Sequence, residues 1–253
     1  MEKQFSINEK GFSVRCLMYC DNPVPGTSVV VCGHGFGGHK ENAAVARFAK
    51  RLLKKNKAVV LAFDWPCHGE DSRKKLILEE CDLYLTLVLN WAQKRFGIDR
   101  RQLFAYATSF GGYLFLKYMA EHGNPFARSV FRCPAVDMAK ALEESIMSPD
   151  QNVLLKSGKP VLAGFDRKIS ISLPFLKQLQ EADLLQMDFS SMAESILIMH
   201  GTKDELIPFE STRHFAQKNG IEFLAVEHAD HRFSDPLIMD LTIDQIVTSL
   251  GFR

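Results

Sequence analysis

Short apolar runs, rich in β-branched residues, recur along this chain of 253 residues, and most are followed by a segment with helical spacing. Examples are TSVVVCG (27–33), AVVLAFD (58–64) and SILIMHG (195–201). Unbroken runs of this kind are typical of strands buried on both faces. Strands that alternate with helices predict an α/β fold with a mainly parallel central sheet flanked by helices. Two alternating stretches, residues 3–9 and 12–19, predict an antiparallel hairpin before the first run.

The alternation of predicted strands and helices stops between about residues 136 and 191. This segment has the spacing of amphipathic helices with loops, as in ISLPFLKQLQEADLL. We interpret it as a helical cap inserted between the sixth and seventh strands, over the carboxyl edge of the sheet, where such folds bind ligands. The predicted organisation is a core of residues 1–135 and 192–253 and a cap of residues 136–191.

Composition and charge exclude several classes of protein. A net charge of +1 gives no general attraction to nucleic acid or to an anionic membrane. The six cysteines are scattered and several lie in apolar runs, which is typical of buried free thiols. Neither a signal peptide nor an apolar run of about 18 residues is present, so we expect a soluble, cytoplasmic protein with no membrane or nucleic-acid partner. No sequence feature indicates the oligomeric state.

The stretch YATSFGG (106–112) has the context of a nucleophile elbow, because Ser109 follows a predicted buried strand and precedes a predicted helix. The pattern G-x-S-x-G needs small residues two positions before and two after the serine. Gly111 fits, whereas Ala107 replaces the first glycine and adds one methyl group. The motif is weakened but not broken. An ordinary strand-to-helix turn with a capping serine is the alternative.

A serine becomes a strong nucleophile only when a base takes its proton. In the order serine, acid, histidine, the chain offers Asp204 in HGTKDELIP and His231 in EHADHRFSD, each in a loop after a late strand. His228 competes with His231. Three other carboxylates compete with Asp204: Glu205, Asp230 and Asp235. Asp64 precedes the serine and therefore fits a structural turn better than the catalytic order.

The glycine-rich loop GHGFGGHKE (33–41) follows a buried strand and can turn a backbone N–H inwards. An oxyanion-hole donor of this kind contributes about 3 kcal/mol to catalysis. The N–H of Phe36 and that of Phe110, which follows the serine, form the expected pair. The alternative, a phosphate-binding loop, lacks both the Walker lysine and a G-x-G-x-x-G pattern with an acidic ribose ligand.

At these residues the chain resembles the α/β-hydrolase superfamily. The motifs HGFGG, FDWPCHGED, ATSFGG, HGTKDELIP and ADHRF stand in the order of that family and span nearly the whole chain. Within the superfamily the sequence looks most like small esterases with a helical cap between the sixth and seventh strands. These include cinnamoyl (feruloyl) esterases and relatives described as serine aminopeptidase-like or acylglycerol lipase-like.

The resemblance implies that Ser109 is the nucleophile, Asp204 the acid and His231 the base, with the amides of Phe36 and Phe110 as oxyanion donors. The family's last loop has a small residue, two variable positions and then the histidine, which favours the later of the two candidate histidines.

Three departures from the family's pattern suggest a divergent branch. Ala107 replaces glycine at the elbow, Pro66 and Cys67 replace the usual Arg-Gly, and His228 replaces a glycine. None of them removes a member of the predicted triad.

The expected function is therefore a serine hydrolase that cleaves a small-molecule carboxylic ester through an acyl-enzyme intermediate, with cinnamoyl or feruloyl esters as substrates that the resemblance implies. No metal or organic cofactor is required. A thioesterase or a small-peptide (amide) hydrolase would use the same triad, and a non-catalytic binding protein on a hydrolase scaffold is an alternative of another class. Four cap residues either line an apolar pocket or form the core of the cap: Phe165, Leu173, Phe175 and Leu176.

Overall fold

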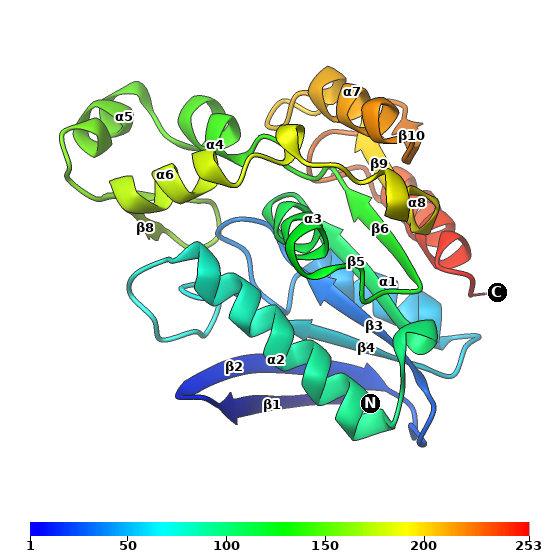
Figure 1. Cartoon of the computed structure of the whole chain (residues 1–253). Coiled ribbons are helices and arrows are strands. Elements are labelled where there is room, and N and C mark those ends of the chain that lie inside the picture. Colours follow the sequence, from blue (N-terminus) through cyan, green and yellow to red (C-terminus); the bar gives the residue numbers. More distant parts are fainter. Residues whose placement is uncertain (253) are drawn as a thin grey trace.

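Eight strands form one sheet in the computed structural model, which describes residues 1–252 (Figure 1). The strands are β1 (Glu2–Glu9), β2 (Phe12–Cys20), β3 (Ser28–Gly33), β4 (Ala58–Phe63), β5 (Leu103–Thr108), β6 (Arg128–Arg132), β9 (Ile196–Gly201) and β10 (Glu222–Val226). Their order is β1-β2-β4-β3-β5-β6-β9-β10. All neighbours from β4 to β10 pair in parallel, whereas β1 and β2 form an antiparallel hairpin and β2 pairs antiparallel with β4. The mainly parallel sheet and its opening hairpin are confirmed.

Helices cover both faces of the sheet (Figure 1). One face packs against α1 (Ala43–Leu53) and α8 (Pro236–Ser249). The other packs against α2 (Leu78–Phe96), α3 (Phe110–His122) and α7 (Phe209–Asn219), and a short helix, η1 (Arg100–Gln102), precedes β5.

The two apolar cores explain why the strand sequences do not alternate. In β3, Val29 and Val31 belong to the core under α2 and α3, whereas Val30 and Cys32 belong to the core under α1 and α8. Every residue of β4 is buried. A strand with helices on both faces has no solvent-exposed side, so each position favours an apolar side chain.

Between β6 and β9 the chain leaves the sheet and forms a separate layer. Figure 1 shows this segment on the side toward which the arrows of β3 and β6 point. Its elements are α4 (Met138–Ala141), η2 (Leu142–Ile146), α5 (Pro149–Lys156), β7 (Val161–Ala163), β8 (Ile169–Ile171), α6 (Leu173–Glu181), η3 (Leu184–Gln186) and η4 (Ser190–Ser195). The antiparallel pair β7–β8 was not predicted, because three-residue strands are too short to show an alternation.

The four apolar residues of this segment divide between the two predicted roles. Phe175 and Leu176 are buried in the core, and Leu173 is half-buried against it. Phe165 lies in the turn between β7 and β8 and is 40% exposed. Only Phe165 is therefore placed to meet a ligand.

All six cysteines are free and buried, as predicted. Within residues 1–252, no helix has both the length and the apolar character needed to cross a bilayer.

Candidate active site

Ser109 occupies the turn between β5 and α3 with φ 53° and ψ −121°. Its N–H donates to the carbonyl of Arg132 at 3.0 Å, and its own carbonyl accepts from the N–H groups of Tyr113 at 3.0 Å and Ala135 at 3.2 Å. A positive φ at a residue other than glycine costs about 1–3 kcal/mol and persists only where neighbours fix it, as these three bonds do. The backbone of Ser109 thus has the strained conformation expected of a nucleophile elbow.

The small residues around the serine are explained by close backbone contacts. A Cβ at Gly111 would lie 2.6 Å from the carbonyl oxygen of His34, so this position excludes every side chain. Ala107 is fully buried and faces Gly33 of β3, where an added Cβ would come within 3.3 Å of the alanine methyl. The alanine at the elbow is therefore accommodated because its neighbour on β3 is a glycine.

Asp204 and His231 meet at the carboxyl edge of the sheet. His231 Nδ1 lies 2.7 Å from Asp204 Oδ2, and the other carboxylate oxygen accepts from the N–H groups of Leu206 at 2.9 Å and Ile207 at 2.8 Å. Burial would raise the pKa of Asp204, but hydrogen bonds from His200 and His231 outweigh it and hold the pKa far below the usual range. Asp204 is therefore a permanent anion that fixes the Nδ1–H tautomer of His231.

The competing residues are either exposed or bonded to other groups. His228 is exposed and its N–H donates to Thr202 Oγ1. Asp230 accepts from the N–H of Ser234, and Asp235 caps α8. Glu205 is exposed.

His200 and Cys133 lie next to the carboxylate of Asp204, and sequence reasoning missed both. His200, the penultimate residue of β9, is fully buried with Nε2 3.1 Å from Asp204 Oδ2 and 3.1 Å from the carbonyl of Ile207. Because both neighbours of Nε2 are acceptors, Nε2 carries the proton. Cys133 Sγ lies within 4.8 Å of the same carboxylate. The one available sequence signal was the histidine directly before Gly201 in an otherwise apolar strand.

Ser109 and His231 line one cavity of about 460 Å³ at this edge of the sheet. Within residues 1–252 no hydrogen bond joins the serine hydroxyl to the imidazole. Hydrogen bonds between catalytic groups are often long or poorly aligned before substrate binds. The missing bond is therefore compatible with Ser109 as a nucleophile and His231 as its base.

The loop after β3 lies against the serine. A Cβ at Gly35 would come within 3.7 Å of Ser109 Oγ. In the described part of the chain, the N–H groups of Phe36 and Phe110 donate to no other protein group. Phe110 is the first residue of α3, where the helix dipole favours negative charge. Both amides are thus available to an oxyanion.

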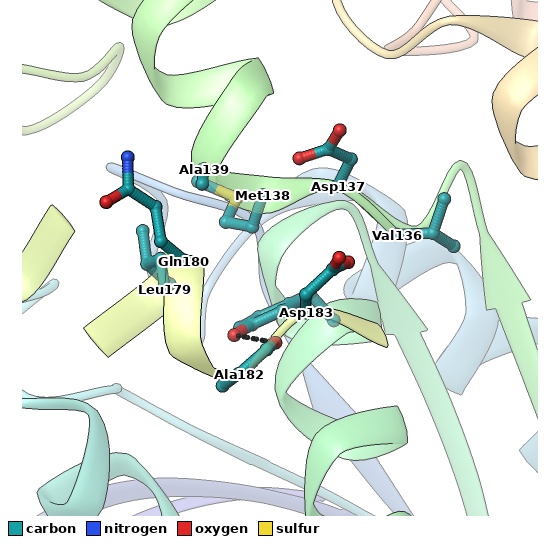
Figure 2. A pocket seen from close by; sticks show the side chains of 9 residues that line it. Val136, Asp137, Met138, Ala139, Leu179, Gln180, Ala182 and Asp183 are labelled. Atoms are coloured by element: carbon teal, nitrogen blue, oxygen red, sulfur yellow. Dashed lines mark hydrogen bonds between the residues drawn. The ribbon is translucent and has the colours of Figure 1, made fainter. Parts of the chain in front are cut away.

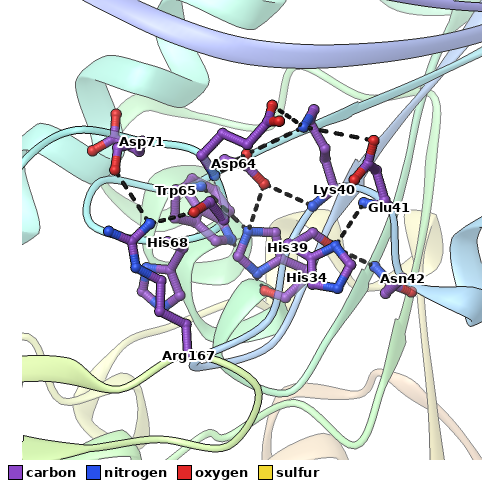
Figure 3. A network of polar contacts seen from close by, with 12 residues as sticks. His34, His39, Lys40, Glu41, Asn42, Asp64, Trp65, His68, Asp71 and Arg167 are labelled. Carbon is purple, nitrogen blue, oxygen red and sulfur yellow. Dashed lines mark hydrogen bonds and ion pairs between the residues drawn. The ribbon is translucent and has the colours of Figure 1, made fainter.

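A buried polar network holds this loop in place (Figure 3). The carboxylate of Asp64 is fully buried and accepts from the N–H groups of Lys40 at 2.7 Å and Glu70 at 2.9 Å. His34 Nε2 accepts from the N–H of Trp65 at 3.3 Å. Burial lowers the pKa of His34 to about 4 and that of His68 to about 3, so both imidazoles are neutral. Asp64 thus has the structural role expected of it.

Comparison with known proteins identifies the family. A family model described as serine aminopeptidase, S33, matches residues 25–166, which is more than half of the chain. The chain belongs to this family. A comparison with curated protein sequences finds no match.

Solved structures show the same fold across almost the whole chain. Est1E from Butyrivibrio proteoclasticus with bound ferulic acid has a TM-score of 0.76 at 17% identity, covering 98% of this chain and 99% of that one. A soluble variant of monoglyceride lipase from Saccharomyces cerevisiae with a substrate analogue has a TM-score of 0.73 at 16% identity, covering 98% of this chain and 94% of that one. Mouse alpha/beta hydrolase domain-containing protein 10 has a TM-score of 0.71 at 14% identity, covering 98% of this chain and 100% of that one. The protein therefore has the α/β-hydrolase fold, and the resemblance to that superfamily is confirmed.

Two departures from the family's glycine pattern lie where glycine is favoured. Cys67 has φ 68° and His228 has φ 64°. Side chains in this left-handed region cost about 1–2 kcal/mol, so this chain carries backbone strain at both positions.

The turn between β7 and β8 is fastened to the loop after β3. The N–H of Arg167 donates to the carbonyl of Gly37 at 2.8 Å, and its Nη1 donates to the carbonyls of Gly69 and, at 3.2 Å, Asp71 (Figure 3). A Cβ at Gly37 would lie 2.7 Å from the backbone nitrogen of Phe165. Arg167 is therefore engaged in packing this turn against the core.

Two clusters in residues 1–252 have the donor types of a metal site, but both are explained by their own hydrogen bonds. Cys133, His200 and Asp204 form the support described above. Around Asp82 and Glu121 the ammonium of Lys117 lies 2.6 Å from each carboxylate, so it already balances their charge.

A second cavity of about 150 Å³ lies between α3, α4 and α6 (Figure 2). Tyr113 lines it and donates through its hydroxyl to the carbonyl of Ala182 at 3.0 Å. Asp137 and Asp183 also line it, but their carboxylates cap α4 and η3. None of the predicted catalytic residues lines this cavity.

Proposed function

We propose that the protein is a serine hydrolase that cleaves carboxylic esters through an acyl-enzyme intermediate. The observation that carries the proposal is the hydrogen bond between Asp204 and His231, because His231 lines the same cavity as Ser109. Membership of the S33 family supports hydrolytic chemistry.

In the proposed mechanism Ser109 Oγ attacks the ester carbonyl while His231 Nε2 takes the hydroxyl proton. Asp204 keeps the imidazole in the required tautomer and stabilises its charged form. The amides of Phe36 and Phe110 bind the oxyanion of the tetrahedral intermediate. His231 then protonates the leaving alcohol. A water molecule attacks the acyl-enzyme in the same way, which releases the acid and restores the serine.

A second candidate is the hydrolysis of small aminoacyl amides, because the family description names an aminopeptidase. The same residues would act, and the leaving amine would need protonation by His231. The bound ferulic acid of Est1E and the lipase–analogue complex favour ester substrates instead.

The test is labelling with a fluorophosphonate probe. We expect the wild-type protein to be labelled and the Ser109→Ala variant to stay unlabelled while retaining its thermal unfolding midpoint. An unlabelled, folded wild-type protein would favour a non-catalytic binding protein. A panel of hydroxycinnamate, acylglycerol and short acyl esters, an acyl thioester and aminoacyl anilides then separates the substrate classes. Turnover confined to the anilides contradicts the ester assignment.

A further inference from the structure

Arg132 ends β6 beside the candidate nucleophile. It pairs with Thr108 of β5, and its carbonyl accepts from the N–H of Ser109 at 3.0 Å. Adjacent strands lie about 4.8 Å apart, so Arg132 starts one strand spacing from the elbow. Arg132 also lines the cavity that contains Ser109 and His231.

The guanidinium of Arg132 is a buried charge without an anionic partner. The residue is 6% exposed, and no carboxylate within residues 1–252 forms an ion pair with it. Nη1 donates to the carbonyl of Arg232 at 3.3 Å and lies 3.5 Å from Met239 Sδ, whereas Nε is buried without a hydrogen-bond partner in the described chain. Buried charges are normally paired, because an unpaired one loses its hydration without compensation.

The carboxylates that line the same cavity cannot supply the missing charge. Glu41 is 4.0 Å from Lys40 Nζ and accepts a hydrogen bond from Gln4. Asp166 is 4.0 Å from Arg232 Nη1. The cavity therefore has an uncompensated positive charge at Arg132.

The guanidinium is also held in one orientation. Its Cζ lies 4.8 Å from the centre of the Phe233 ring, within the range of a cation–π contact. Met239, which Nη1 contacts, lines the cavity too, so this end of the side chain reaches the cavity wall. An arginine fixed in this way, whose Nη2 donates to no protein group in the described part of the chain, is suited to a charge-assisted hydrogen bond with a carboxylate.

We propose that Arg132 binds a carboxylate of the substrate, so that the enzyme prefers esters that carry a second, free carboxylate in their acyl or alcohol part. Arg132 is then a specificity-determining residue, and the proposal rests on the proposed ester hydrolysis at Ser109.

The experiment compares matched ester pairs that differ in one negative charge. On the acyl side, the 4-nitrophenyl monoesters of glutaric and adipic acid are compared with 4-nitrophenyl pentanoate and hexanoate. On the alcohol side, 3-(4-acetoxyphenyl)propanoate is compared with 4-propylphenyl acetate. For at least one pair we expect wild-type kcat/KM to be at least about tenfold higher for the anionic ester, as one charge-assisted pair provides.

The variants assign this preference to Arg132. Arg132→Met should abolish it by lowering kcat/KM for the anionic ester at least about tenfold more than for the neutral ester, and Arg132→Lys should retain part of it. Arg128→Met removes one positive charge from the exposed start of the same strand and should leave the preference unchanged.

Two results would overturn the proposal: equal or better turnover of every neutral ester by the wild type, or an equal loss for both members of a pair in Arg132→Met. If Arg132→Met does not fold, the wild-type ratios and the Arg132→Lys ratios decide. Absence of both fluorophosphonate labelling and ester turnover would contradict the proposed function itself, a result distinct from ester turnover without charge preference.

Discussion

Asp204 accepts more hydrogen bonds than the orientation of one histidine requires. Oδ2 faces both His231 Nδ1 and His200 Nε2, and Oδ1 accepts two backbone N–H groups. Each bond favours the charged carboxylate, and together they fix its orientation toward His231. At the scale of single residues, His200 is therefore a positioning residue that acts through Asp204.

We expect His200→Phe to lower kcat about tenfold to hundredfold, because a hydrogen bond to a charged group contributes about 1.5–3 kcal/mol. KM should change little, since His200 does not line the cavity. His200→Gln, which places an amide donor near the position of Nε2, should recover most of the loss. Steady-state kinetics on a neutral ester measures both variants, and equal losses of kcat in the two would contradict this role.

In the elbow, we expect a methyl group to be tolerated at position 107 but not at position 111. We expect Ala107→Gly to leave kcat/KM within about threefold and to lower the free energy of unfolding by about 1 kcal/mol, because glycine adds chain entropy to the unfolded state. Denaturant unfolding and ester kinetics test this variant together. A large gain in activity would show that the alanine had impaired the turn.

Gly111→Ala should behave differently. Its Cβ would lie 2.6 Å from the carbonyl oxygen of His34 and 2.8 Å from backbone atoms of Gly33, so the loop that carries Phe36 has to shift. We expect kcat/KM to fall at least about a hundredfold, with a loss of stability of about 1–3 kcal/mol from overpacking. Unchanged kinetics in this variant would mean that the loop does not hold an oxyanion donor.

The β7–β8 turn is a second element whose contacts reach the candidate site. Arg167→Met keeps the length of the side chain but removes its bonds to the carbonyls of Gly69 and Asp71. We expect a loss of about 1–2 kcal/mol in unfolding free energy and faster proteolysis within residues 160–172. Lys168→Met is the matched control, because within residues 1–252 Lys168 Nζ bonds only to Gly164 in its own turn. Similar proteolysis of both variants would show that the Arg167 side-chain hydrogen bonds do not hold this turn against the core.

At the scale of the whole molecule, the two buried neutral histidines make stability depend on pH. Unfolded histidines titrate near pH 6.5, whereas burial lowers the pKa of His34 to about 4 and that of His68 to about 3. As the pH falls from 6.5 towards 4, the unfolded chain binds protons that the folded chain does not. Stability should therefore decrease through this window, by up to about 1.4 kcal/mol per pH unit for each histidine.

His68→Asn tests this pH dependence. The asparagine amide retains a donor toward the carbonyl of Pro66, which His68 Nδ1 contacts at 2.8 Å, but it does not titrate. Denaturant unfolding between pH 5 and 6.5 should give a slope reduced by up to about 1.4 kcal/mol per pH unit relative to the wild type, with the full difference near pH 5. An unchanged slope would show that His68 is protonated in the folded protein.

The layered fold could be predicted from the sequence because strands buried on both faces produce unbroken apolar runs such as residues 27–33. The proximity of Asp204 and His231 was predictable because parallel strands bring their carboxyl ends to one edge. The roles of His200 and Arg132 were not predictable, since a polar residue in a strand does not reveal which neighbour it faces. The β7–β8 pair escaped detection because its strands contain three residues each.

The hydrogen bond from the Arg167 N–H to the Gly37 carbonyl connects the β7–β8 turn to the loop that contains Phe36. A displacement of this turn large enough to admit a bulky substrate would pull on the residue next to the Phe36 amide. We expect admission and catalytic readiness to be coupled, since a displaced Phe36 amide would leave the proposed oxyanion site incomplete. Selection against oversized substrates would then appear as slower turnover rather than weaker binding.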